Sequence, residues 1–581
     1  MTFKMNNLKL CFFFVFSVLG EELKKASQPN IIIIVTDDLG WNDVSFHGSS
    51  QILTPNIDAL AYNGIILNRH YTPPLCTPSR ASLMTGKHPI NIGMQHHVIE
   101  SDQPWGLGLD QKLMPEYFRE AGYKTHLVGK WHLGFFRKAY TPTQRGFDSH
   151  FGYVGPYIDY WDHSLRMSNT STRGLDMRRD LDVDYSGNGS YATDLFNNEA
   201  IRIIKEHYKK SPLFLVLTHL APHTGNEDDP MQAHIEDVDR FSYIKDIKRR
   251  VLAAMISKVD EGFGNIVRTL KQCNMLDNSI ILFYSDNGAP SLGIHSNSGS
   301  NYPLRGQKYS PWEGAVRTVA FVWSPHLELV GRVSDQWIHV SDWLPTLAHA
   351  AGIGGIPIGS EVDGKDQWNA LRNTSLSVRN IVMNNIDRIY YYSSYIKNGW
   401  KYVNGTSWSG KYDHWLGQID TKDELSEAEY WGKLSSSIVA KILSLDIKQA
   451  DAMRHAATVI CDTYSNASIC DPQKSPCLFD LINDPCEQNN LAASYPEIES
   501  DLRQDVQRYM EIATEPRNKP GDNRSDPIHY NTTWTWWLDE LDHADNTTHS
   551  VTVLVVVLVV VCISTILVIF WLFMLTSKVM R

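Results

Sequence analysis

Acidic side chains follow two short apolar segments of the chain, and their positions suggest a metal site. Asp37 and Asp38 come after the first segment, and Asp286 and Asn287 come after a later one. Such groups can simply cap helices or form turns. If both segments are strands of one sheet, however, three carboxylates meet at one edge and repel each other unless a cation lies among them. Oxygen ligands favour calcium or magnesium, so we expect one divalent cation, calcium by preference.

Cys76 stands apart from the other cysteines in a segment with a distinctive pattern. Residues 76–80 read C-T-P-S-R, and residues 81–86 read A-S-L-M-T-G. This segment resembles the sulfatase signature C-x-P-S-R-x-x-x-x-T-G, and every fixed position matches. The alternative is an ordinary buried cysteine before a helix, but a match of this length is too specific for it.

The resemblance implies a covalent modification of Cys76. In the sulfatase family, a dedicated lumenal enzyme reads the pentapeptide and oxidises the cysteine to formylglycine. We therefore expect a formylglycine-generating enzyme as a partner during maturation. Formylglycine at position 76 would be a catalytic group and a metal ligand, and Arg80 would steady its hydrate.

A second family signature places a lysine and a histidine close together. Residues 122–134 resemble the stretch G-Y-x-T-x-x-x-G-K-W-H-L-G, which includes Lys130 and His132. On an extended segment, residues two apart point to the same face. The alternative is a solvated lysine and a structural histidine. We expect both side chains to reach the active site.

Two further segments are similar to the arylsulfatase B (N-acetylgalactosamine-4-sulfatase) branch of the family. One ends in Ala221-Pro222-His223, and the resemblance favours His223 over His219 as the functional histidine. The other, residues 302–317, resembles the block P-L-R-G-x-K…W-E-G-x-V-R and indicates Lys308 as the lysine that binds substrate. The implied substrate is N-acetylgalactosamine 4-sulfate in dermatan or chondroitin sulfate.

These residues together imply a two-step hydrolysis of sulfate esters. One hydroxyl of the hydrated aldehyde attacks sulfur and expels the alcohol; the other then loses its proton, and sulfate leaves. Calcium would polarise a sulfate oxygen. Lys130 and Lys308 would neutralise the developing charge. His223 or Lys308 would protonate the alcohol, and His132 would be the base of the elimination step.

Two other functions remain as alternatives. A phosphatase or phosphodiesterase of the same superfamily would use the same sheet edge, but with Ser or Thr as nucleophile and usually two zinc ions. A catalytically silent, membrane-anchored glycan-binding protein would have lost Cys76, Lys130 or Asp286, and all three are present.

The pattern of apolar residues predicts an α/β fold. Ile31–Val35, Leu213–Leu217 and Ile280–Tyr284 are apolar on both faces, as in strands of a covered sheet. Two segments that lie between these strands along the chain, Lys112–Ala121 and Arg249–Lys271, have apolar residues at helical spacing. The resemblance implies the alkaline-phosphatase-like sulfatase fold, in which helices flank a large mixed sheet. A smaller C-terminal α+β domain with an antiparallel sheet should follow.

The short strands expected in that smaller domain are Tyr390–Tyr392, Trp400–Val403 and Cys477–Leu481. The expected divisions of the chain are a signal peptide at 1–20, the catalytic domain at 28–375, the C-terminal domain at 376–522, a juxtamembrane stretch at 523–550, a transmembrane helix at 551–575 and a cytoplasmic tail at 576–581.

Both ends of the chain carry membrane signals. Leu10–Leu19 is an apolar run too short to span a bilayer, typical of a signal peptide. Val551–Leu575 is uncharged, and as a helix it would be about 37 Å long, enough to span a membrane. Lys578 and Arg581 follow it and predict a cytoplasmic end, hence a type I protein. A glycolipid-anchor signal is the alternative.

The remaining features fit the secretory pathway, with the lysosome and the cell surface both open. Four clustered cysteines suggest two disulfides, for which sequence allows three connectivities; we favour Cys477–Cys486. The net charge of −11 argues against a nucleic-acid partner. Sequons for N-glycosylation begin at Asn169, Asn188, Asn373, Asn404, Asn466, Asn523, Asn531 and Asn546.

Overall fold

The computed structural model describes residues 28–167, 172–207, 211–356, 361–373, 377–461, 470–542 and 558–572. The predicted signal peptide lies outside these residues.

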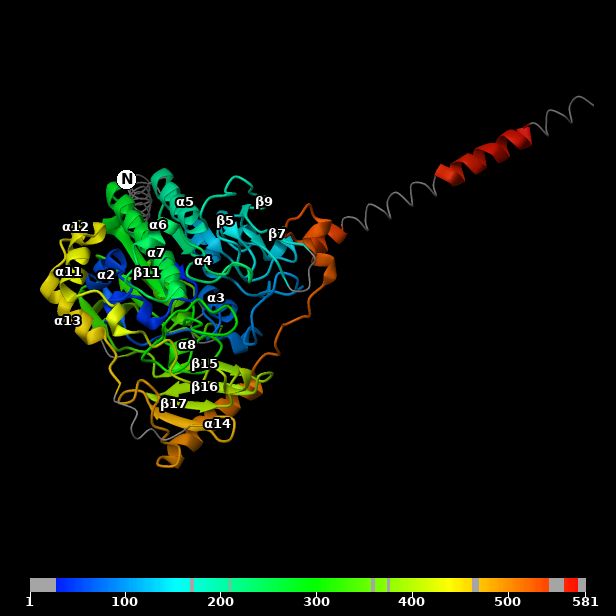
Figure 1. Cartoon of the computed structure of the whole chain (residues 1–581). Helices are drawn as coiled ribbons and strands as arrows, with labels where there is room; N and C mark the ends of the chain where they lie inside the picture. The colour runs from blue at the N-terminus through cyan, green and yellow to red at the C-terminus, as the bar shows by residue number, and fades with distance from the viewer. Residues whose placement is uncertain are drawn as a thin grey trace, which may run out of the picture.

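A large mixed sheet organises the body of the protein (Figure 1). Its strand order is β13-β2-β12-β11-β1-β10-β4-β5-β8-β9. The central strand β1 pairs in parallel with β10 on one side and β11 on the other, and β10 pairs in parallel with β4. The strands are β1 (Asn30–Thr36), β2 (Ile65–Leu67), β4 (Lys124–Lys130), β5 (Ser149–Tyr153), β8 (Arg178–Arg179), β9 (Asp182–Val183), β10 (Leu213–Thr218), β11 (Ser279–Ser285), β12 (Ala320–Trp323) and β13 (Arg332–Ser334).

Helices cover the sheet, which explains its continuous apolar strands. Every residue of β1, β10 and β11 is buried. The long helix α7 (Ile247–Gln272) packs against α2 (Pro55–Tyr62) and α5 (Ala192–Glu206). A second group is α3 (Cys76–Thr85), α4 (Met114–Glu120) and α9 (Trp343–Ala350), of which α3 contacts both others. The predicted α/β class and the mixed sheet are confirmed.

A four-stranded antiparallel sheet forms the opposite end of the body (Figure 1). Its strands are β15 (Ile381–Asp387), β16 (Tyr392–Lys397), β17 (Trp400–Asn404) and β18 (Cys477–Asp480), and α14 (Pro496–Ile512) packs against it. The strand expected at 390–392 begins only at Tyr392. Tyr391 lies in the preceding turn with a φ of 56°, so its ring is 82% exposed.

The two disulfides are Cys461–Cys486 and Cys470–Cys477, so the favoured pair Cys477–Cys486 is wrong. That pair assumed a hairpin between the two cysteines. Instead, β18 starts at Cys477 and pairs only with β17, and no returning strand brings residue 486 back to it.

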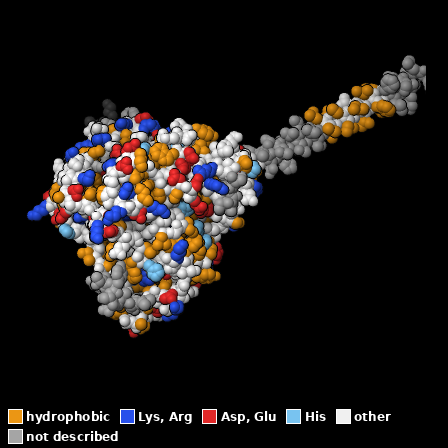
Figure 2. Space-filling model, in the orientation of Figure 1, with side chains coloured by type: hydrophobic (Ala, Val, Ile, Leu, Met, Phe, Trp, Pro, Cys, Tyr) orange, Lys and Arg blue, Asp and Glu red, His pale blue; other side chains and the backbone are white. Residues whose placement is uncertain are grey.

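The last described segments have different surroundings. Trp534 and Trp537, in the predicted juxtamembrane stretch, are buried against the main body. Residues 558–572 form a helix away from the body, with hydrophobic side chains exposed along it (Figures 1 and 2). Among the described residues, no helix has the length and apolar character needed to cross a membrane. The rest of the predicted 551–575 span lies outside them.

Candidate active site

Four neighbouring parallel strands end at one edge of the large sheet, and polar residues follow each of them. Thr36 of β1 is in register with Ser285 of β11, so Asp37 and Asp286 leave the sheet side by side. On the other side of β1, strand β10 leads to His223, and β4 ends at Lys130. The parallel register therefore brings residues from distant parts of the chain to one place.

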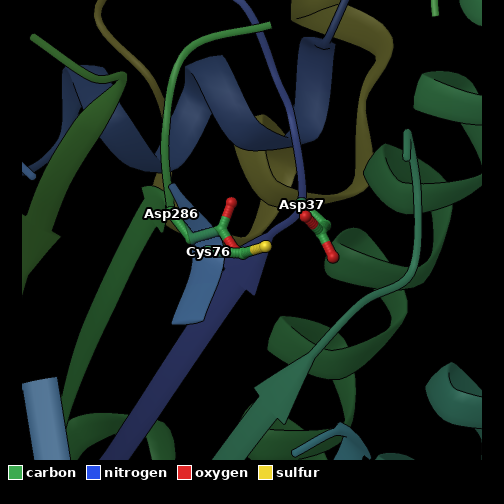
Figure 3. Close-up of side chains that lie close together, drawn as sticks. All are labelled: Asp37, Cys76 and Asp286. Atoms are coloured by element: carbon green, nitrogen blue, oxygen red, sulfur yellow. The ribbon is translucent and has the colours of Figure 1, made fainter. Parts of the chain in front are cut away.

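Cys76 lies at the first position of α3 and faces the two acidic strand ends. Figure 3 shows its sulfur between the carboxylates of Asp37 and Asp286. One potential ligand atom from each of these three residues lies within 4.8 Å of those of the other two. Burial raises the pKa of the Cys76 thiol, which keeps it protonated. A protonated thiol is a poor nucleophile, so unmodified Cys76 is not activated by these surroundings.

Three buried cations neutralise the three buried carboxylates. Lys130 Nζ lies 2.6 Å from Asp37 Oδ2, and Lys308 Nζ lies 2.7 Å from Asp38 Oδ1. Arg80 binds Asp286 at 2.8 Å and Asp37 at 3.4 Å. Burial alone would raise the pKa of Asp37, but the positive charges of Lys130, Arg80 and Lys308 hold it well below its usual range.

The acidic residues at this sheet edge offer oxygen ligands that suit a hard cation. Asp37 Oδ1 and Asn287 Oδ1 are buried and have no hydrogen-bond partner among the described residues. The Asn287 amide donates to Asp38 Oδ1 at 2.6 Å, which turns its own oxygen away from that bond. A group of three carboxylates and one amide, with two of its oxygens unpaired, matches the oxygen-rich coordination of calcium or magnesium. His223 also lies within reach of Asp37 and Asp38 as a potential ligand.

His132 is held in one tautomer. Its Nε2 lies 2.9 Å from the Ile99 carbonyl oxygen, which can only accept, so the proton is on Nε2. Its Nδ1 is buried and has no hydrogen-bond partner among the described residues. Burial and the charges of Lys130 and Arg80 lower the pKa of His132 well below its usual value. The ring is therefore neutral, with Nδ1 able to accept a proton.

His132 does not lie on an extended segment, although the sequence predicted one. Strand β4 ends at Lys130, and His132 has a φ of 60° in the left-handed region. The turn, and not strand alternation, positions the imidazole.

His223 points its Nε2 atom toward Asp38. The Nε2–Oδ2 distance is 3.6 Å, and Nδ1 donates to the Thr224 carbonyl at 2.7 Å. Burial and Lys308 lower the pKa of His223 well below its usual value. His219, the competing histidine, is buried beside β10 and is absent from the residues that line the cavity at Cys76.

A cavity of about 260 Å³ opens above Cys76. Its lining includes His132, His223 and Lys308, which places three predicted residues around one space. Sequence analysis missed the other lining side chains, because they come from loops without a strong motif. These are His97, Val98, Glu100, Pro156, Tyr157, Ile294, His295, Tyr309 and Trp408.

Comparison with known proteins decides the family. The sulfatase family model matches residues 29–353. This chain belongs to the sulfatase family. The protein is therefore an enzyme that hydrolyses sulfuric esters, as the sequence predicts.

Two curated relatives agree with this assignment. Arylsulfatase J of Mus musculus is 36% identical over 520 residues, which cover 88% of this chain and 81% of that protein. N-acetylgalactosamine-6-sulfatase of Homo sapiens is 30% identical over 348 residues, covering 58% of this chain and 64% of the relative.

Solved structures show the same fold. The crystal structure of Ps i-CgsB in complex with k-i-k-neocarrahexaose has a TM-score of 0.66 and 26% identity, over 90% of this sulfatase and 99% of that chain. The PsFucS1 sulfatase from Pseudoalteromonas sp. has a TM-score of 0.62 and 22% identity, over 87% and 95% of the two chains.

Proposed function

We propose that this sulfatase uses formylglycine at position 76 and one calcium ion to remove sulfate from N-acetylgalactosamine sulfate units of dermatan or chondroitin sulfate. The observation that carries the proposal is the position of Cys76. It lies at the start of α3, between Asp37 and Asp286, in a cavity also lined by Lys308. A sulfate ester in that cavity would meet position 76 and a buried cation together.

The cation would be held by Asp37, Asp38, Asp286, Asn287 and the modified residue 76. When bound, it would supply Lewis-acid polarisation of the sulfate. Formylglycine would supply a covalent nucleophile that can be regenerated in each cycle. Arg80 reaches Asp286 and Asp37 from α3 and would hold the nucleophile in register with the acidic edge.

The other side chains have roles that their contacts support. Lys130 and Lys308 are buried and charged, and would stabilise negative charge on the sulfate oxygens. Asp38 helps to hold the pKa of Lys308 well above its usual value although burial opposes this, so Lys308 stays protonated. His132 would accept a proton at Nδ1 in the elimination step. His223 would donate from Nε2 to the leaving alcohol when its ring is charged, with Lys308 as the alternative donor.

The choice of N-acetylgalactosamine rests on relatives. The human relative is named as an N-acetylgalactosamine-6-sulfatase. The motif resemblance to arylsulfatase B favours the 4-sulfate, so both point to the same sugar and differ in the position of the ester.

Two measurements test this function. Mass spectrometry of the peptide that contains residue 76 should find formylglycine in active protein, and Cys76→Ala should fold without turnover. Desulfation of N-acetylgalactosamine 4-sulfate and 6-sulfate oligosaccharides should identify the ester. Full activity from protein with an unmodified thiol would refute the mechanism, and inactivity on both sugars would refute the substrate.

The disulfides and the C-terminal apolar run bear on where the protein is located. Two disulfides suit an oxidising compartment, so we place the catalytic body in the secretory pathway, in the lysosome or at the cell surface. The uncharged 551–575 run would anchor it as a type I protein. Truncation after His549 should release active enzyme into the medium. Release of the full-length form by a phospholipase would indicate a glycolipid anchor instead.

A further inference from the structure

An exposed tryptophan stands at the mouth of the active-site cavity. Trp408 lines the same cavity as Cys76 and Lys308, yet 37% of its surface is exposed to solvent. It is the first residue of η8 (Trp408–Gly410), which follows β17 in the part of the chain that belongs to the small sheet. A large aromatic side chain exposed at the edge of a polar cavity is a candidate for ligand contact.

The backbone holds this ring in an unfavourable conformation. Trp408 and Ser409 have φ values of 50° and 52°, in the left-handed region that bulky residues avoid. Strain of this kind persists where surrounding contacts enforce it, often at ligand sites. Here Ser407 Oγ donates to the Tyr309 carbonyl at 2.6 Å. The tryptophan is thereby tied to the residue that follows Lys308.

Trp408 is part of an aromatic wall. Its ring centroid lies 6.1 Å from that of Tyr309 and 6.2 Å from that of Tyr390. Tyr309 in turn lies 6.4 Å from the ring of His97. We call these four residues the aromatic wall: His97, Tyr309 and Trp408 line the cavity, and Tyr390 packs beside Trp408.

A second cavity adjoins the first and is lined by several acidic residues. An adjoining cavity of about 470 Å³ shares Glu100, Tyr157 and His295 with the first. Its acidic lining residues are Glu100, Asp102, Glu227 and Asp228, and Arg166 adds a positive charge. Burial raises the pKa of Glu100 to about 7, and Asp228 pairs with Arg173, so the net negative charge rests mainly on Asp102 and Glu227. A sulfated glycan is a polyanion, so electrostatic repulsion disfavours extension of the glycan in this direction.

The volume of the inner cavity limits how much of a glycan it can hold. At about 260 Å³ it is smaller than pockets that enclose whole drug-sized ligands, about 300–1,000 Å³. It therefore suits the sulfate and the sugar ring that bears it. The next ring of an oligosaccharide must lie outside, and the aromatic wall is the uncharged side available to it.

We propose that Trp408 binds the sugar ring adjoining the sulfated sugar, by stacking on the apolar C–H face of that ring. This inference rests on the proposed glycan substrate. Burial of a C–H face against indole removes apolar surface from water on both partners. Trp408 is thus a specificity residue that favours oligosaccharides over single sulfated sugars.

The test compares two substrates with the same sulfated sugar, a monosaccharide and a trisaccharide. Trp408→Ala should raise KM for the trisaccharide about tenfold, as loss of one aromatic contact predicts, and change that for the monosaccharide less than about twofold. Trp408→Phe should retain most of the preference. Tyr391→Ala is the matched control, because Tyr391 is an exposed aromatic of the small sheet that does not line the cavity.

The possible outcomes distinguish a wrong role for Trp408 from a wrong proposed function. Equal effects of Trp408→Ala on both substrates, or no effect on either, would overturn the role of Trp408 and leave the proposed function intact. Failure of the wild-type enzyme to desulfate either sugar would overturn the proposed function, and with it the premise of this inference.

Discussion

The ammonium group of Lys308 binds the carboxylate of Asp38, 270 residues earlier in the chain, at 2.7 Å from Oδ1 and 2.8 Å from Oδ2. Both side chains are buried, so each compensates the charge of the other. In the proposed mechanism the same carboxylate also holds calcium, and the same ammonium meets the sulfate. This pair therefore links charge balance in the site to substrate binding.

Lys308→Ala should lower sulfate hydrolysis by about 10²–10³, because one buried donor to the transition state is lost. It should also leave Asp38 without its lysine, so that thermal stability depends more on calcium than in the wild type. Thermal unfolding with calcium and with a chelator measures this dependence. Lys411→Ala, at an exposed lysine, is the control. An identical calcium response in Lys308→Ala and wild type would argue against Asp38 as a ligand.

Removal of one metal ligand should weaken calcium binding. Asp37→Asn removes a ligand charge, and Asn287→Ala removes a ligand oxygen without changing net charge. Both should reduce the calcium content per chain and lower the rate by orders of magnitude. Asp260→Asn, a buried acid outside the site, should keep full calcium content. Elemental analysis measures the metal content per chain, and two zinc ions per chain would contradict the proposed calcium site.

Asp260 should make stability depend on pH. Burial, with a contribution from the charge of Asp58, raises its pKa to about 7 in the folded protein, against about 3.9 in an unfolded chain. Between these values the folded state binds more protons, so this contribution to stability falls as pH rises from about 4 to about 7. Asp260→Asn should flatten that decline in urea unfolding. If the free energy of unfolding fell equally with pH in Asp260→Asn and in the wild type, the raised pKa of Asp260 would be contradicted.

Lys401 should be essential for stability. Its Nζ lies 2.9 Å from Glu313 and 2.8 Å from Glu487, and all three side chains are fully buried. Lys401→Met removes the cation shared by two buried carboxylates, leaving Arg317 at 3.9 Å from Glu313 as their remaining cation partner among the described residues, and should cost about 3–5 kcal/mol. Lys397→Met is the matched control, since Lys397 pairs with the exposed Asp501 and with Asp505 and should cost about 1 kcal/mol or less. Equal losses in urea unfolding would disprove the distinction.

Strands and helices with a clear local pattern of apolar residues could be predicted from the sequence. Ile31–Val35 has no polar residue and forms the buried core of β1, and the apolar stripe around Val259 forms the inner face of α7. The specific spacing of the motifs was enough to single out Cys76, His132, His223 and Lys308, which the structure brings to one cavity. The disulfide partners and the aromatic wall were not, because both depend on how loops from distant segments meet. Trp408, for example, reaches the cavity through a turn in which it and Ser409 are themselves left-handed, and bulky or polar residues give no sequence signal for that conformation.

The burial of Cys76 also has a consequence for biosynthesis. In the folded protein this residue is 2% exposed and lies in the first turn of α3, enclosed by residues that follow β11. A modifying enzyme that reads residues 76–80 must therefore act after they are synthesised and before the segment that follows β11 packs over Cys76. Substitutions that alter the timing of this closure would change the fraction of molecules that become active, while each active molecule would keep its normal rate.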